Sequence, residues 1–246
     1  MVKNNSAKVL EEVMQLCQDE RDSEAEDLIR MHLAIDPDNL QLMTNLGVIQ
    51  ARLYKDQKAE STFKSVLAIN PNYEEAICGL GRLLDQSLRI EEAEELYREF
   101  LQNNPIGHCA LEDLCRLLHT ENRTDEALIL AREHVENYGY HLQAYDAIRY
   151  VLNVLEDRLE DELCNDREND RIFTDLINNL LEQLEMVNSI EQSIRLSENM
   201  YTELEDDKTR LISEIKQLVD SAPSRHISIS SEIINRINKI KLLNQS

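Results

Sequence analysis

Residues 46–71 read LGVIQARLYKDQKAESTFKSVLAINP, and several positions of this stretch return thirty-four residues later. Gly47 returns as Gly81, and Pro71 returns as Pro105. One alanine position recurs four times on the same period, as Ala25, Ala59, Ala93 and Ala127. Chance rarely produces such a correlated set, so the stretch is one unit of an internal repeat.

The spacing inside the unit predicts two helices joined by a tight turn. The first helix has a stripe at i, i+3, i+4 and i+7, formed by Met43, Leu46, Gly47 and Gln50. The second has a stripe at i, i+4 and i+7, formed by Ala59, Phe63 and Val66. Residues 55–57 make a polar turn, and Asn70 ends the second helix because a residue before proline is pushed out of the helical region. Gly47 and Ala59 are small, which lets the two helices approach closely.

This thirty-four-residue pattern resembles the tetratricopeptide repeat family. The third unit matches best, with Ile77, Leu80, Gly81, Leu84, Ala93, Tyr97 and Pro105 at the family positions. The first unit has Val13 and the fourth has Cys115 where glycine is expected, and the fourth ends in Gly139 instead of proline. Weaker terminal units suit a stack whose ends act as caps. The resemblance implies an all-α right-handed superhelical solenoid of stacked helical hairpins.

The repeat predicts how the chain is divided. Residues 4–155 form an array of about four repeats and a capping helix at 141–157, where Tyr145, Ile148 and Leu152 are in phase. The array stops there because Asp161 stands where a small residue should be. Residues 156–171 are too charged to bury much, which predicts a solvated helix end or a hinge before residues 172–246.

The C-terminal part has heptad-like seams typical of a helical or coiled-coil segment. One seam comprises Phe173, Ile177, Leu180, Leu184 and Val187. A capping box of Ser189 and Gln192 would start a new helix and fold this part into a hairpin instead of one rod. After a break at 221–224, Ser230 or Ser231 caps a last helix, which is basic. We expect this helix to dock on the acidic hairpin, with a dimer contact or a membrane surface as alternatives.

The composition agrees with the all-α class and restricts the partners. Only five Gly, four Pro, no Trp and three Phe occur in 246 residues, and the net charge is −22. This charge opposes binding to nucleic acids and to anionic membranes, although an acidic surface often serves solubility alone. The N-terminus resembles no secretory leader, and five cysteines without CxxC spacing fit reduced thiols, so we expect a cytoplasmic protein.

Signals for catalysis are sparse, and the sequence predicts neither an enzyme nor a cofactor or metal site. The motifs GxGxxG, GxxxxGK[ST], GxSxG and HExxH do not occur. His108, Cys115 and His119 share one helix face, but they spread over more than about 15 Å at ~1.5 Å rise per residue. That distance is too long for one ion.

The family resemblance implies a concave groove lined by the first helix of each hairpin. The repeat register places these partner-binding candidates there: Leu10, Met14, Asn45, Val48, Arg52, Arg82, Gln86, Asp113, Arg116 and Tyr150, with Asp146 before the last. The chaperone-binding members grip a C-terminal carboxylate through Lys, Asn and Arg side chains of three repeats. Only Asn45 matches that set, so we expect no chaperone-tail clamp.

Two of the groove candidates are arginines at equivalent positions, Arg82 and Arg116. A pair of guanidinium groups would orient an acidic segment. Alternatively, Asp85 and Asp113 pair with these arginines at i+3 and i−3. We favour this self-paired alternative.

The sequence thus predicts a scaffold that binds a peptide or helix of another protein in the groove. One alternative is a structural or self-assembling protein whose groove holds its own C-terminal helix or another copy. Another alternative is an acidic chaperone for basic client proteins. The heptad seams also allow a homo-oligomer through the C-terminal helices.

Overall fold

The computed structural model describes residues 3–138, 142–165, 169–193, 198–225 and 229–243. These residues form helices and turns, and no strand occurs among them. Their contacts cluster into two compact units, Met1–Leu117 and Leu118–Ser246. The all-α class is confirmed. The predicted array of residues 4–155 spans both units, and its limits and the hinge at 156–171 stay predictions.

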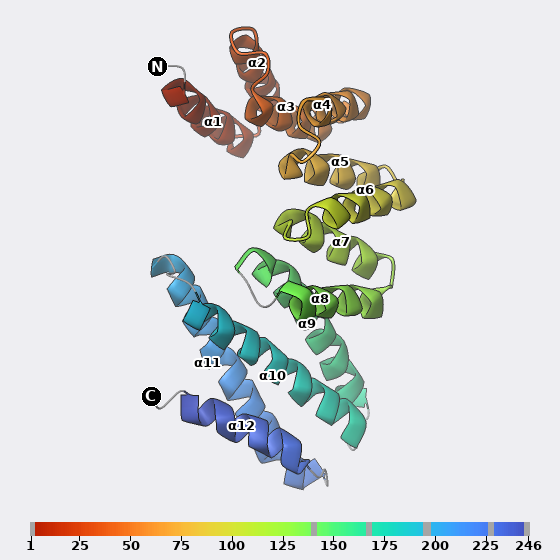
Figure 1. Ribbon diagram of the computed structural model, residues 1–246, viewed down its shortest axis with the longest axis vertical. Coiled ribbons are helices and arrows are strands. Elements are labelled where there is room, and N and C mark those ends of the chain that lie inside the picture. Colours follow the sequence, from red (N-terminus) through yellow and green to blue (C-terminus); the bar gives the residue numbers. More distant parts are fainter. Residues whose placement is uncertain (1–2, 139–141, 166–168, 194–197, 226–228, 244–246) are drawn as a thin grey trace. The chain divides into compact units, whose positions relative to one another are not determined.

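The first unit is a stack of helical hairpins (Figure 1). Its helices are α1 Lys3–Gln18, α2 Asp22–Leu33, α3 Leu40–Arg52, α4 Asp56–Ile69, α5 Glu74–Gln86, α6 Ile90–Asn103 and α7 His108–Thr120, whose last turn crosses the division between the units. Each helix from α1 to α5 packs against the next one along the chain, and α3 also packs against α5. This packing confirms the stacked hairpins that the repeat predicted.

The turn inside each hairpin repeats as regularly as the alanines. Four residues that are not glycine have φ between 57° and 61°, namely Glu20, Tyr54, Leu88 and Asn122, and they are thirty-four residues apart. In the second hairpin the Tyr54 N–H donates to the Ala51 carbonyl at 2.9 Å, and the Lys55 N–H donates to the Gln50 carbonyl at 2.8 Å. These two bonds form a Schellman motif, in which a left-handed residue ends the helix.

Glycines allow the close packing between helices of the first unit. A Cβ atom on Gly47 would lie 2.7 Å from the Phe63 ring, and one on Gly79 would lie 2.5 Å from the same ring. A Cβ atom on Gly81 would lie 2.3 Å from Cζ of Tyr97. The repeated glycine therefore accepts the buried aromatic ring of the second helix, a contact more specific than the general close approach expected from the sequence.

A periodic ion pair joins neighbouring hairpins. Lys55 donates to Glu26 at 2.6 Å, and Arg89 donates to Glu60 at 2.8 Å. The cations are thirty-four residues apart and so are the carboxylates, each of which directly follows a repeated alanine. The turn that ends one helix thus also ties its hairpin to the preceding one.

The second unit consists of longer helices. They are α8 Thr124–Tyr138, α9 Leu142–Asn165, α10 Asp170–Ser193, α11 Glu198–Ser221, the short 3-10 helix η1 Ala222–Arg225 and α12 Ser231–Leu243. α10 packs against α9, α11 and α12 (Figure 1). α10 and α11 pack against each other, but Ser189 lies inside α10, so the predicted capping box does not start a new helix there. The coiled-coil interpretation stays a prediction.

The charged segment after residue 155 begins as a helix end. α9 continues to Asn165 because Leu159 and Leu163 give it a buried stripe, with exposed fractions of 5% and 4%. Glu156 is buried as well and accepts a hydrogen bond from Gln183 at 2.6 Å and one from Arg210 at 2.9 Å. Three charged or polar side chains from α9, α10 and α11 thereby satisfy one another inside the unit.

The last helix docks on α10, as expected from its basic charge. The Ser230 hydroxyl accepts from the Ile233 N–H at 3.3 Å, which caps α12, and the Ile233 side chain is buried. Arg236 donates to Glu185 at 3.1 Å and to Asn178 at 2.9 Å. The basic face of α12 therefore meets an acidic side chain of α10.

Candidate functional site

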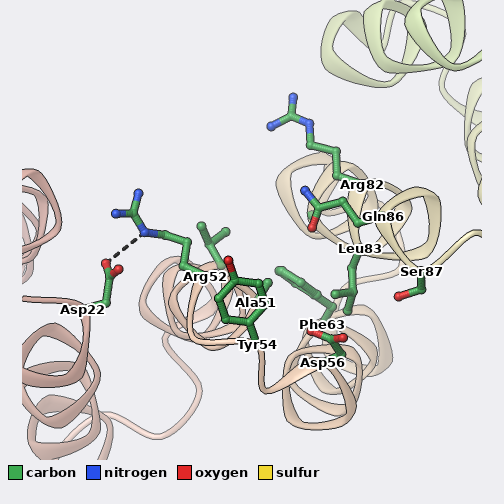
Figure 2. Close-up of a pocket in the computed structure, with 12 residues that line it drawn as sticks. Asp22, Ala51, Arg52, Tyr54, Asp56, Phe63, Arg82, Leu83, Gln86 and Ser87 are labelled. Atoms are coloured by element: carbon green, nitrogen blue, oxygen red, sulfur yellow. Dashed lines mark hydrogen bonds and ion pairs between the residues drawn. The ribbon is translucent and has the colours of Figure 1, made fainter. Parts of the chain in front are cut away.

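A pocket of about 700 Å³ lies between the first helices of two neighbouring hairpins. α3 contributes Val48 and Arg52, and α5 contributes Arg82 and Gln86 (Figure 2). These four were predicted groove residues, and they occupy two repeat positions one helical turn apart, with Val48 equivalent to Arg82 and Arg52 equivalent to Gln86. Helices one hairpin apart present the same face to the same side, so the register of the repeat brings the four together.

The pocket also has an apolar part. Phe63 and Leu83 line it although both are largely buried, and Val48 is 43% exposed. Tyr54 lies at the pocket with 91% of its surface exposed, in the left-handed conformation described above. An apolar wall beside a few polar groups is the usual composition of a site that binds another molecule.

Arg82 is held by a buried carboxylate and still reaches solvent. Its Nε donates to Oδ1 and Oδ2 of Asp113 at 3.0 and 2.8 Å. Burial opposes the charge of Arg82, but Asp113 outweighs it and raises the pKa of the guanidinium. The Arg82 side chain is 54% exposed, and its two Nη atoms bond to nothing among the described residues. They are available to a ligand.

Arg116 contacts the same carboxylate, so one aspartate serves two arginines. The self-paired alternative is therefore correct for both guanidinium groups, but the partner expected for Arg82 is wrong. Arg82 reaches Asp113 across the gap between α5 and α7, whereas Asp85 would have required a contact within α5. Asp113 was predicted to face a partner, yet its side chain is 2% exposed, and it acts on the groove only through the arginines.

Arg52 is tied to the preceding hairpin. Its Nε donates to Asp22 Oδ1 at 2.9 Å, and its Nη2 donates to the Cys17 carbonyl at 3.1 Å. Figure 2 shows Arg52 turned toward Asp22, whereas Arg82 and Gln86 extend together from α5. The Gln86 amide has no hydrogen bond within the part of the chain that the structure describes. Arg82 and Gln86 are thus the two polar groups most free to meet a ligand.

The other groove candidates do not line this pocket. Leu10 packs against the core of the first hairpins, and Met14 is 58% exposed on α1. Asn45 turns back along its helix and donates to the Gln41 carbonyl at 2.8 Å. Tyr150 lies in the second unit, where its ring meets the edge of His119 at a centroid distance of 6.1 Å. The side chain of Asp146 lies outside the described residues.

Sequence reasoning missed Tyr54, Asp22 and the buried side chains Phe63 and Leu83 as parts of the pocket lining. The sequence assigned Phe63 to the packing between helices and assigned no role to Leu83; both are buried, and both also line the pocket. Tyr54 occupies the left-handed turn position, which recurs at residues 20, 54, 88 and 122. The four residues at this position are all of different types. Only the thirty-four-residue period of the helix ends could have indicated Tyr54 from the sequence.

A second pocket, of about 420 Å³, lies in the second unit. Glu160 from α9 and Glu214 from α11 line it together with Cys164, Leu176 and Leu218. Burial raises the pKa of Glu160 and that of Glu214, the latter against the opposing effect of Arg210. This pocket presents two glutamates and no arginine, whereas the first pocket has two arginines beside Asp22 and Asp56.

Of the three possible metal ligands that share one face of α7, the structure describes the side chains of Cys115 and His119. Cys115 is fully buried, and burial raises its pKa to about 12. His119 Nδ1 lies 3.0 Å from the Thr124 hydroxyl, and the side chain of His108 lies outside the described residues. A different cluster, Glu74, Cys78 and Cys109, brings three ligand atoms within 4.8 Å of one another among the described residues.

The fold and the pocket together define the class of protein. Thirty-four-residue helical hairpins, a glycine that accepts an aromatic ring and a pocket between successive first helices are the features of a tetratricopeptide-like repeat protein. No family model matches the chain, and no curated protein matches it.

Several solved structures are similar to this chain. A tetratricopeptide repeat protein from Parabacteroides merdae is 17% identical over 96% of this chain and 98% of that one, with a TM-score of 0.47. MamA from Desulfovibrio magneticus is 12% identical over 87% and 95% of the two chains, with a TM-score of 0.43. Another MamA structure is 15% identical over 70% and 95%, with a TM-score of 0.44. The repeat class rests on the helix spacing and packing, not on these distant likenesses.

Within the described ranges, no helix combines the length and the apolar character that a bilayer crossing requires.

Proposed function

We propose that the protein is an interaction module that binds a segment of a partner protein, as an extended peptide or a helix, in the groove between α3 and α5. The pocket between these helices carries the proposal, because it combines an apolar wall with half-exposed arginines on a rigid scaffold. In this proposal the groove residues bind the partner segment and do not catalyse a reaction.

The lining suggests the chemistry of the bound segment. The free Nη atoms of Arg82 and the amide of Gln86 suit a carboxylate, since a guanidinium can donate two parallel hydrogen bonds to it. Val48, Leu83 and the exposed Tyr54 ring suit an apolar side chain next to it. The preferred ligand is therefore a segment with an acidic residue close to a large apolar one.

The docking of α12 favours an external partner over the protein's own C-terminal helix. Ile233 and Arg236 of α12 are already engaged with α10. The chaperone for basic clients is supported only by the net charge of −22, and the arginines of the groove have the wrong sign for basic clients. A second copy of the chain remains one of the candidates that a binding screen would reveal.

A peptide library screened against the full chain tests the proposal. We expect enriched peptides to contain an acidic and a large apolar residue, and Val48→Asp and Gln86→Ala each to weaken a selected peptide. A tenfold weaker Kd corresponds to about 1.4 kcal/mol, and Val48→Asp is expected to reach it. Calorimetric titration of each variant measures the Kd.

The matched control is Glu95→Gln, because Glu95 is exposed on α6 and does not line the pocket. This variant should bind as the wild type does. Peptides that bind the Val48→Asp variant with unchanged affinity would place the binding site elsewhere, as would an equal loss in Glu95→Gln.

A further inference from the structure

Two cysteines meet where α5 packs near α7. The Sγ atoms of Cys78 of α5 and Cys109 of α7 lie within 4.8 Å of each other, although thirty-one residues separate them in sequence. Arg82 and Asp113 have the same separation and lie one helical turn further along both helices. The repeat geometry therefore places the pair of thiols and the arginine–aspartate pair side by side at one helix interface.

A carboxylate completes the cluster. Glu74 lies one turn before Cys78 on α5, and its carboxylate and the two sulfurs lie within 4.8 Å of one another. In a tetrahedral zinc site, with Zn–S near 2.3 Å and Zn–O near 2.0–2.2 Å, the ligand atoms are about 3.4–3.8 Å apart. Small side-chain rotations would bring the three atoms to that separation.

The surroundings suit a bound cation. Glu74 accepts a hydrogen bond from the Ala110 N–H at 3.1 Å, and such second contacts orient metal ligands. Cys109 lies in the first turn of α7, where the helix dipole favours a thiolate. Cys78 is 3% exposed, whereas Cys109 and Glu74 are only partly buried. The cluster therefore has a dry side and a side open to solvent.

We propose that Glu74, Cys78 and Cys109 form a binding site for a thiophilic divalent cation of the zinc class, with water as the fourth ligand. Two thiolates and one carboxylate suit zinc, and an open fourth position follows from the solvent-exposed side. On binding, each thiol loses its proton to solvent, and the ion bridges the two sulfurs. The bound ion links α5 to α7 and fixes the interface from which Arg82 extends.

The sequence did not indicate this site, because no two of its ligands form a local metal motif. Glu74 and Cys78 are one turn apart, but Cys109 comes from the next hairpin. Only the stacking of the hairpins brings the two parts together.

Cobalt titration of the reduced full chain tests the site. Cobalt(II) substitutes for zinc, and we expect a thiolate-to-cobalt charge-transfer band and visible bands of a tetrahedral ion, saturating at one equivalent and abolished by zinc. Cys109→Ser should remove most of the charge-transfer intensity. Glu74→Gln should retain the band with an affinity lower by about tenfold or more, the size of effect seen when a site loses one supporting group.

Cys164→Ser is the matched control, because Cys164 is an exposed cysteine on α9. It belongs to the second unit, whereas the cluster belongs to the first. It should bind cobalt as the wild type does, and far-ultraviolet circular dichroism should show that all three variants remain helical. Absence of the charge-transfer band in the reduced wild type would overturn the proposal. An equally intense band in Cys109→Ser would also overturn it, and an unchanged affinity in Glu74→Gln would remove the carboxylate from the ligand set.

Discussion

At the scale of single residues, the most unusual feature is the left-handed residue that ends the first helix of each hairpin. Glycine adopts this conformation freely, but here it is taken by Glu20, Tyr54, Leu88 and Asn122. A side chain with Cβ in this region costs of order 1–3 kcal/mol. The two Schellman hydrogen bonds and the following ion pair hold the turn in place against that cost.

Leu88→Gly should therefore stabilise the protein. Leu88 is 85% exposed with φ 60°, so its replacement removes backbone strain and almost no packing. Glycine also gains freedom in the unfolded chain, which offsets about 0.5–1 kcal/mol, and the net gain should be about 0.5–1 kcal/mol. Urea unfolding followed by circular dichroism measures it.

The neighbouring residue supplies the control for this change. Ser87 is exposed with φ −88°, where glycine brings no relief, so Ser87→Gly should be neutral or destabilising. If Leu88→Gly destabilised the protein as much as Ser87→Gly does, the strain at this turn would be negligible.

Tyr54 is the one strained residue of this set with a side chain at the pocket. The left-handed conformation recurs at the other three turns and belongs to the turn itself, so it is the 91% exposed ring at the pocket that favours a role of Tyr54 in binding. The equivalent Leu88 does not line this pocket.

At the scale of helices, the repeat period was enough to predict the hairpins. Two closely packed helices require small residues such as Gly47 and Ala59 opposite a large one such as Phe63. The spacing of these residues therefore predicted the helical hairpin. Four of the predicted groove residues line one pocket, since residues at equivalent repeat positions share a face, and their role in binding stays a prediction.

Contacts between hairpins could not be predicted in the same way. Arg82 pairs with Asp113 of α7 and not with Asp85 of its own helix, and Arg116 pairs with the same carboxylate. The sequence also gave no sign that α10 would continue past Ser189, where a serine that can cap a helix lies inside one. Helix capping is a local preference that tertiary packing readily overrides.

Glu60 makes the stability of the stack depend on pH. It accepts from Arg89 at 2.8 Å and from Lys64 at 2.6 Å, and these hydrogen bonds lower its pKa from the ordinary 4.5. A lowered pKa means that the contribution is complete above pH 4.5 and is lost as the pH falls through the lowered value. Glu60→Gln should cost about 0.5–1 kcal/mol at pH 7 and almost nothing in strong acid.

Urea unfolding of wild type and Glu60→Gln at both pH values measures the difference. Glu95→Gln is again the control, because Glu95 makes no ion pair among the described residues and its loss should leave the difference near zero at either pH. A Glu60→Gln deficit that stays constant into acid would assign the effect to packing and not to the ion pair.

At the scale of the whole molecule, acidic side chains outnumber the basic side chains that can pair with them. The chain has forty-eight acidic and twenty-six basic residues. Many of the basic residues form ion pairs, such as Lys55–Glu26 and Arg132–Glu182. The remaining acidic side chains repel one another, which destabilises the compact state. Solvent ions screen this repulsion over about 8 Å at physiological ionic strength.

Added salt should therefore stabilise the protein at neutral pH. Between about 0.02 and 0.2 M sodium chloride the screening length falls from about 20 to about 7 Å, which weakens repulsion between distant surface charges more than it weakens pairs in contact. We expect the urea midpoint at pH 7 to rise over this range, measured by circular dichroism. Near the sequence pI of about 4.6 the net charge approaches zero, so the same salt step should shift the midpoint much less. A midpoint that falls with salt at pH 7 would mean that the ion pairs between helices outweigh the repulsion among the excess carboxylates.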